Sequence, residues 1–165
     1  MADVAPSRAA GDAPRTVYLT CAAFQDHDEL PTHLTCEGEG VAPALAWRGI
    51  PGDTVEIAVV CEDPDASGGT FVHWMMAGID SGLDGLDENV IPEGAAVGVN
   101  DAGTTGYAAP CPPPGEEPHR YVFTVFASAD GLALEHGFTA RELHDALQGS
   151  VIAVGTLTAT FERAR

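Results

Sequence analysis

The sequence predicts a mainly β fold, built mostly from antiparallel sheet, with a helix near the carboxyl terminus. Three observations predict it. The 165 residues include 19 Gly and 12 Pro, with few aromatic residues, which suits a turn-rich, strand-rich fold better than a helical bundle. Several short segments alternate apolar and polar side chains, the pattern of a half-buried strand. The clearest start and stop signals of a helix lie in the segment 139–149.

The amino-terminal half supplies four predicted strands. The run from Ile57 to Cys61 is continuously apolar, which indicates a central strand covered on both faces. Pro51-Gly52 marks a turn before that strand, and residues 26–43 form a polar loop region. The predicted strands span residues 16–24, 44–47, 54–62 and 71–79.

The carboxyl-terminal half combines long loops with two strands and the helix. Thr139 and Glu142 have the spacing of a capping box, and Gly149 stands where a helix commonly ends. Loops as long as the two expected here are uncommon unless they are functional. The expected elements are a loop without secondary structure at 80–98, a second loop at 100–118, strands at 120–128 and 156–161, and the helix at 139–149.

The chain is expected to form one domain after a short leader. Residues 1–14 are rich in Ala, Pro and Asp and lack the apolar stretch of a signal peptide, so we expect a disordered leader. Residues 15–165 are numerous enough for a substantial core. The chain has no apolar run approaching the roughly 20 residues that cross a bilayer. These features predict a cytoplasmic protein without stable membrane insertion.

The charge is strongly acidic. Asp and Glu number 25 against 7 basic residues, all of them Arg, for a net charge of −18. Such a surface offers no basic footprint for nucleic acid. A hydrophobic content of 45% excludes acidic disorder for the body of the chain. A surface adapted to molar salt, where the Debye length falls to about 3 Å, explains the charge and predicts a halophilic source.

The four cysteines do not have the spacing of a zinc site. They lie at positions 21, 36, 61 and 111 and form no CxxC pair. Buried thiols are the default in a cytoplasmic protein. Cys36 and Cys111 lie in loop-like stretches, which leaves a disulfide between them open.

Five ionisable side chains lie at or near the ends of apolar strands: Asp63, Asp65, His73, His119 and Tyr121. If strands 54–62, 71–79 and 120–128 are neighbours, these groups converge on one mouth, a common composition for a ligand site. Each group also has a simpler interpretation. The two aspartates could form an Asx-turn, and His73 could be a core residue whose polar atoms are hydrogen-bonded. His119 and Tyr121 could belong to an exposed stripe on one face of a strand.

Taken in order along the chain, these stretches resemble the phosphatidylethanolamine-binding protein family, in its bacterial and archaeal Raf-kinase-inhibitor-like branch. The resemblance covers most of residues 16–162. The matching residues are Thr35-Cys36-Glu37-Gly38, Pro43, Trp47, Asp63-Pro64-Asp65-Ala66, His73-Trp74, Asn100-Asp101, Gly103, Gly106-Tyr107, Pro110-Cys111-Pro112-Pro113, Gly115 and His119-Arg120-Tyr121.

The resemblance implies a large antiparallel sheet packed on a smaller sheet, with helices near the carboxyl terminus. It also implies a non-enzymatic binding protein without a cofactor, whose small pocket holds phosphate or other anionic groups, such as a phospholipid headgroup or a nucleotide. The residues implied for this pocket are Asp63, Asp65, His73, Pro112, His119 and Tyr121.

The chemistry of such a pocket is unusual because the chain has no Lys. Arg120 should point away if its neighbours His119 and Tyr121 point inward. The donors are then the imidazoles, the Tyr121 hydroxyl and backbone N–H groups. The aspartates are expected to accept from the imidazoles and favour their protonated form. Binding should therefore weaken as pH rises through the histidine pKa values.

Other functions remain open at this stage. The family includes kinase-pathway modulators and serine protease inhibitors, so a protein partner bound through a surface loop such as 80–98 is the main alternative. A hydrolase that uses Cys111 with His119, or a metal held by His73, His119 and Asp63, is less favoured. A homodimer is also open.

Overall fold

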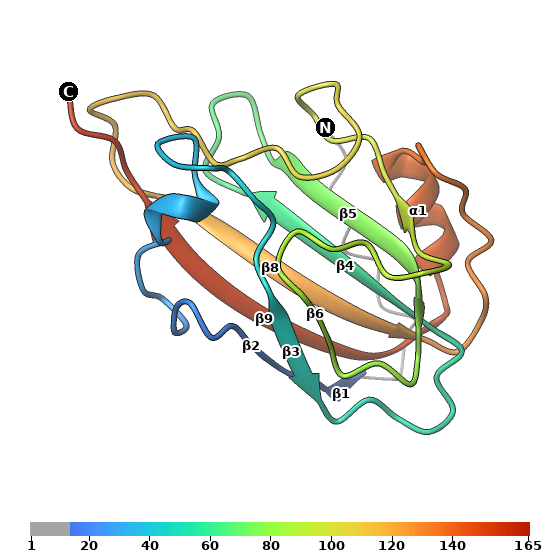
Figure 1. Ribbon diagram of the computed structural model, residues 1–165. Helices are drawn as coiled ribbons and strands as arrows, with labels where there is room; N and C mark the ends of the chain where they lie inside the picture. The colour runs from blue at the N-terminus through green and yellow to red at the C-terminus, as the bar shows by residue number, and fades with distance from the viewer. Residues whose placement is uncertain (1–13) are drawn as a thin grey trace.

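The computed structural model describes residues 14–165, which form two β-sheets and one α-helix (Figure 1). The predicted leader therefore lies, except for Pro14, outside the described residues. The strands are β1 (Arg15–Thr16), β2 (Tyr18–Thr20), β3 (Leu45–Arg48), β4 (Glu56–Asp63), β5 (Phe71–Asp80), β6 (Gly85–Leu86), β7 (Ala96–Val97), β8 (His119–Ser128) and β9 (Val151–Phe161), with a 3₁₀ turn at Thr32–Leu34 and the helix α1 at Ala140–Leu147.

The large sheet has six strands in the order β1-β9-β8-β4-β5-β7, and the small sheet has the order β2-β3-β6. All neighbouring pairs are antiparallel except β1 and β9, which are parallel. The predicted mainly β fold, with a large sheet packed on a smaller one, is confirmed. β4 lies between β5 and β8, so the three strands that carry the ionisable groups are neighbours, as expected.

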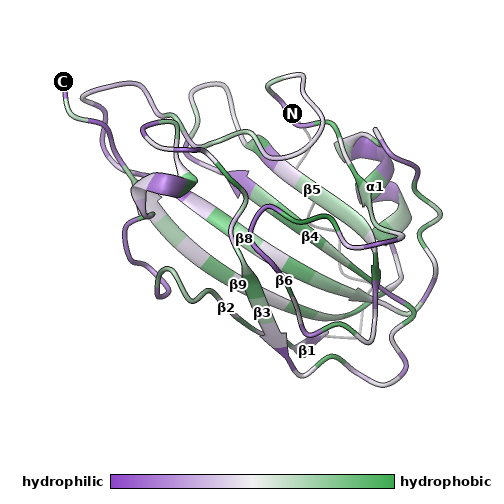
Figure 2. Ribbon diagram, viewed as in Figure 1, coloured by the Kyte–Doolittle hydropathy of each residue, from purple (hydrophilic) through white to green (hydrophobic). Residues whose placement is uncertain are grey.

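The strand β4 is the centre of the core, because both of its faces are covered. Val59 and Cys61 face a cluster that includes Trp47 of the small sheet. Val60 lies on the opposite face, in a cluster that includes Leu143 of the helix. Figure 2 shows the hydrophobic colour running along this strand. The continuous apolar run in the sequence thus reflects burial between the small sheet and the helix.

The helix α1 begins and ends as predicted. The Thr139 hydroxyl oxygen accepts a hydrogen bond from the Glu142 backbone N–H at 3.1 Å, and that hydroxyl lies 3.2 Å from the Glu142 carboxylate. Gly149 has a positive φ of 74°, the left-handed conformation that glycine adopts readily after a helix. Leu143 and Leu147 are fully buried against the large sheet.

Three sequence predictions about element limits were wrong. The segment 80–98 contains β6 and β7, whose two residues each are too few to produce a periodic pattern. The segment 16–24 is divided between sheets, because Thr16 pairs with Val154 in the large sheet whereas Tyr18 pairs with Arg48 in the small one. The final strand begins at Val151 and not at residue 156. The alternation pattern did not indicate its first part, because residues 151–155 form an apolar run without alternation.

Among residues 14–165, no helix has the length and apolar character needed to cross a membrane.

Candidate functional site

The candidate site lies where three strands of the large sheet meet at one end. β4 ends at Asp63, which pairs with Phe71 at the start of β5. On the other side of β4, Glu62 pairs with Val122 near the start of β8. Because β4 is antiparallel to both neighbours, the end of β4 and the beginnings of β5 and β8 share one edge. The topology therefore brings the predicted ionisable groups to one edge.

His119 is bonded to a carboxylate through each ring nitrogen. Its Nδ1 lies 2.8 Å from Oδ2 of Asp63, and its Nε2 lies 2.9 Å from Oε2 of Glu116. Burial acts to lower the pKa of His119, but the hydrogen bonds to Asp63 and Glu116 outweigh it, so the pKa lies above its ordinary value. Only the imidazolium donates from both nitrogens, so the arrangement favours the charged form.

His73 has the opposite character. Its Nδ1 lies 2.7 Å from the backbone oxygen of Ala108, and its ring contacts Phe71 and Tyr121 with centroid separations of 4.7 and 5.3 Å. Burial lowers the pKa of His73, against the hydrogen bond to Ala108, which raises it. The neutral ring donates from Nδ1 to the carbonyl, which leaves Nε2 as an acceptor. The expectation that a carboxylate would accept from this imidazole was wrong, because a carbonyl takes that place.

Tyr121 is fully buried, and its hydroxyl has no hydrogen-bond partner within residues 14–165. Its ring meets that of His73 edge to face, with an angle of 74° between the planes. Burial, followed by the nearby charge of Asp63, raises the pKa of Tyr121 well above its ordinary value. The hydroxyl therefore remains protonated, as a donor without an acceptor.

The two aspartates have different roles. Asp63 is buried, and its Oδ1 also accepts from the backbone N–H of Asp65 at 2.8 Å, so the Asx-turn and the contact with His119 coexist. Asp65 is held by Arg120 instead of an imidazole. It accepts from the Arg120 backbone N–H and Nε at 2.9 Å each and from a terminal guanidinium nitrogen at 2.8 Å. The side-chain hydrogen bond from Arg120 lowers the pKa of Asp65.

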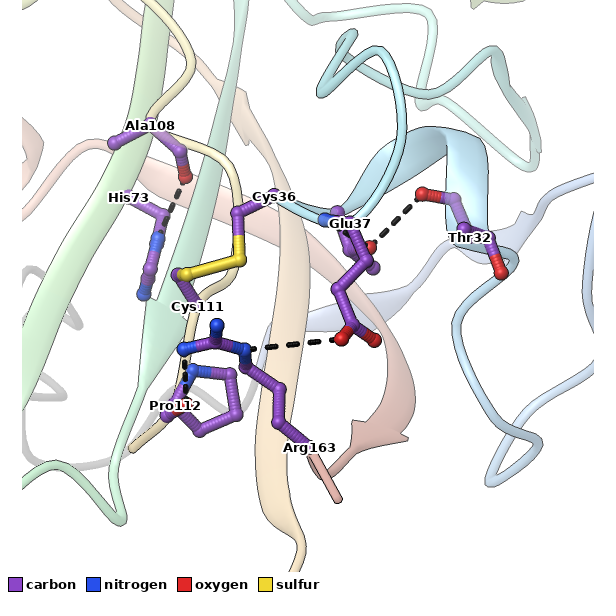
Figure 3. Close-up of a disulfide and its surroundings, with 9 residues drawn as sticks. Thr32, Cys36, Glu37, His73, Ala108, Cys111, Pro112 and Arg163 are labelled. Carbon is purple, nitrogen blue, oxygen red and sulfur yellow. Dashed lines mark hydrogen bonds and ion pairs between the residues drawn. A yellow bond between two sulfur atoms is a disulfide. The ribbon is translucent and has the colours of Figure 1, made fainter. Parts of the chain in front are cut away.

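The loop that carries Pro112 is tied to a second loop by a disulfide between Cys36 and Cys111 (Figure 3). The pairing of Cys36 with Cys111, which the sequence left open, is therefore present in the structure. Pro112 is buried, and its backbone oxygen accepts from Arg163 at 3.3 Å. Because the Cys111 sulfur is bonded to Cys36, it cannot serve as a nucleophile beside His119 in this structure. Cys21 and Cys61 are buried free thiols.

Sequence reasoning missed Glu116, the second partner of His119. The signal available was its position three residues before His119, but it stands in a loop on a strongly acidic surface. An open cleft of about 570 Å³ lies beside this pair and is lined by Asp65, Glu116, Glu117, Pro118, His119 and Arg120. Within the described part of the chain, no group of three or more His, Cys, Asp or Glu side chains is placed to hold a metal ion.

Comparisons with known proteins agree with the fold. The family model described as phosphatidylethanolamine-binding protein matches residues 20–162. A UPF0098 protein of Methanothermobacter thermautotrophicus is 38% identical over 146 residues, covering 86% of this chain and 95% of the relative. A Mycobacterium tuberculosis protein named as a lipoprotein, LppC, is 36% identical over 152 residues, covering 91% of this chain and 75% of the relative. The structure of Escherichia coli YbcL, described as a new member of the mammalian PEBP family, superimposes with a TM-score of 0.83 at 29% identity, covering 88% of this chain and 98% of YbcL.

Proposed function

Because this chain belongs to the phosphatidylethanolamine-binding protein family, we propose that it is a non-enzymatic binding protein whose site holds a phosphate-like anionic group. The ligand would be a phosphorylated small molecule, such as a phospholipid headgroup or a nucleotide. The residues that we assign to it are those predicted from the sequence: Asp63, Asp65, His73, Pro112, His119 and Tyr121.

The observation that carries the proposal is the unpartnered hydroxyl of Tyr121. A buried polar group without a partner costs about 1–3 kcal/mol. The cost is removed when a ligand oxygen accepts from the hydroxyl, which requires the side chains that cover it to move, since Tyr121 is fully buried and does not line the open cleft. Two polar residues act on Tyr121 within its otherwise hydrophobic cluster, because His73 lies against its ring and Asp63 acts electrostatically on it.

The two histidines give the site complementary functions. His119, as an imidazolium, supplies positive charge in a cleft whose only other cation among the lining residues, Arg120, is paired with Asp65. His73, as a neutral ring, offers Nε2 to a protonated oxygen of the ligand. The pKa of His119 lies above its ordinary value, so affinity for the anion is full at acid pH and falls as pH rises through that raised pKa.

The acidic surface bears on the salt concentration at which such a protein functions. We propose that the −18 charge is an adaptation to molar salt, which screens repulsion between the protein and an anionic ligand. The same charge disfavours nucleic acid and anionic membrane surfaces as partners. The cytoplasmic location stays a prediction, and the exposed disulfide argues against it, since such bonds are typical of oxidising compartments.

Thermal unfolding in molar KCl tests the proposal. Phosphate, phosphorylethanolamine and a nucleotide would each be added to wild type, His119→Ala and His144→Ala, the last being a histidine on α1 as a matched control. A ligand at 100 times its Kd adds about 2.7 kcal/mol, a shift of several degrees. Phosphate also stabilises proteins through exclusion from their surface, so the excess over His119→Ala is the relevant quantity.

The expected result is an excess shift in wild type and His144→Ala that is absent in His119→Ala. Equal shifts in all three proteins would overturn the anion site. The remaining alternatives would then be inhibition of a protease or kinase through a surface loop, or another protein interaction.

A further inference from the structure

The two carboxylates bonded to His119 differ in their surroundings. The Asp63 side chain is 5% exposed and is fixed by the turn that follows β4, where it also accepts from the Asp65 backbone. The Glu116 side chain is 45% exposed and belongs to the loop before β8. Glu116 lines the open cleft together with His119 and Arg120. One carboxylate is therefore part of the folded framework, whereas the other approaches the same ring from the solvent side.

We propose that Glu116 is an internal anion that occupies Nε2 of His119 until an anionic ligand displaces it, and that it thereby lowers the affinity of the site. This inference rests on the proposed function and specifies what limits the affinity of the same site. The contact is the one at 2.9 Å between Nε2 of His119 and Oε2 of Glu116.

Displacement requires little rearrangement of the fold. Glu116 lies outside the strands, and its half-exposed carboxylate can return to water without leaving a buried charge behind. The loop itself stays anchored, because the Gly115 N–H donates to the Arg163 backbone oxygen at 2.9 Å. A change of side-chain rotamer at Glu116 is sufficient to open Nε2.

Competition of this kind acts on every anion that needs Nε2 of His119. Glu116 has to leave the ring before phosphate or acetate binds there, so the apparent affinity of each is reduced by the same fraction. Glu116 should therefore lower the affinity for all such anions by a similar factor.

The charges around His119 determine the conditions of the test. They come from Asp63 at the end of β4, Glu116 in the loop before β8, His73 on β5, and the pair of Asp65 and Arg120 beside the cleft. Removal of the Glu116 charge lowers the pKa of His119, because only one carboxylate then stabilises the imidazolium. Affinities should therefore be compared near pH 5.5, below the ordinary histidine pKa of about 6.5.

Glu116→Gln and Glu117→Gln form a matched pair. Both remove one charge from the same cleft, but within residues 14–165 Glu117 makes no hydrogen bond with His119. Calorimetric titration with inorganic phosphate and with acetate, at constant KCl, should give about tenfold tighter phosphate binding for Glu116→Gln than for Glu117→Gln. Acetate binding should tighten by a similar factor in Glu116→Gln and stay unchanged in Glu117→Gln. NMR titration of the His119 ring without ligand should give a lower pKa in that variant alone.

The outcomes separate this inference from the proposed function. Phosphate binding by wild type with equal affinities in the two variants, or an unchanged His119 titration in Glu116→Gln, would overturn the inference and leave the anion site in place. Binding by Glu116→Gln when wild type binds nothing measurable would support both. Absence of phosphate binding in all three proteins would overturn both.

Discussion

The Nδ1 atom of His119 lies 2.8 Å from Oδ2 of Asp63, which joins the first residue of β8 to the last residue of β4. The two residues are 56 positions apart in the sequence, and both are buried. The contact satisfies a carboxylate that would be costly to bury alone. It also fixes the His119 ring, whose second nitrogen faces Glu116 at the cleft. One buried pair thus links the end of the central strand to the candidate site.

This pair predicts how stability depends on pH. The folded-state pKa of His119 is raised, so its stabilising effect is full below the ordinary histidine pKa of about 6.5 and is lost as pH rises through the raised value. The free energy of unfolding, from urea titrations between pH 5.5 and 9, should exceed that of His119→Gln most at acid pH. His144→Gln, whose ring contacts Gln148, is the control. A difference between wild type and His119→Gln that grows with pH would contradict the prediction.

Tyr121→Phe separates a binding role from a structural one. Its hydroxyl is buried without a partner among the described residues, so its removal should leave the free energy of unfolding unchanged or raise it by about 1 kcal/mol. Phosphate affinity should fall about three- to tenfold, as expected for one lost hydrogen bond.

Tyr107→Phe is the matched control for that change. The Tyr107 hydroxyl donates to the Leu34 backbone oxygen at 2.9 Å, so this variant should lose about 1 kcal/mol of stability. It should bind phosphate as wild type does. A Tyr121→Phe variant that is clearly destabilised and binds normally would assign the hydroxyl to the fold instead.

The disulfide should contribute strongly to stability. Cys36 and Cys111 are 75 residues apart, and closing a loop of this size contributes about 4 kcal/mol in the chain-entropy model. Urea unfolding of the double variant Cys36→Ser, Cys111→Ser should therefore give a lower free energy by about this amount. Dithiothreitol should lower the stability of wild type to the same level and leave the double variant unchanged. Wild type that is insensitive to reduction would show that the bond does not form in solution.

Gly155→Ala tests the close approach of β9 to the segment between β1 and β2. A Cβ atom at Gly155 would meet the backbone oxygen and carbonyl carbon of Val17, which a side-chain rotation cannot relieve. The free energy of unfolding should fall by about 2 kcal/mol or more. Gly131→Ala, where a Cβ atom meets nothing within 4 Å, should stay within about 0.5 kcal/mol of wild type. Equal effects of the two substitutions would contradict the packing argument.

Local patterns were sufficient for β4, β5, β8 and the helix, but not for the first half of β9. The apolar run of β4 and the capping residues of α1 express preferences that the chain carries wherever it folds. The short strands β6 and β7 exist only through distant pairing, as between Leu86 and Leu45 or Val97 and Met76, and therefore left no local pattern. The continuity of strand 16–24 was wrongly predicted for the same reason. Thr16 pairs with one sheet and Tyr18 with the other, and no local pattern marks the change.

The sequence by itself determined which ionisable groups stand near strand ends, among them Asp63, His73, His119 and Tyr121, since runs of apolar residues mark where these strands begin and end. Only the tertiary structure decided which groups pair. Glu116 bonds His119 and Arg120 holds Asp65 because long charged side chains have many rotamers, and neighbours from other segments select among them. The disulfide likewise depends on two loops bringing Cα atoms 75 residues apart to within 5.4 Å. Distances between segments remote in the chain arise from packing of the whole core, which no local pattern encodes.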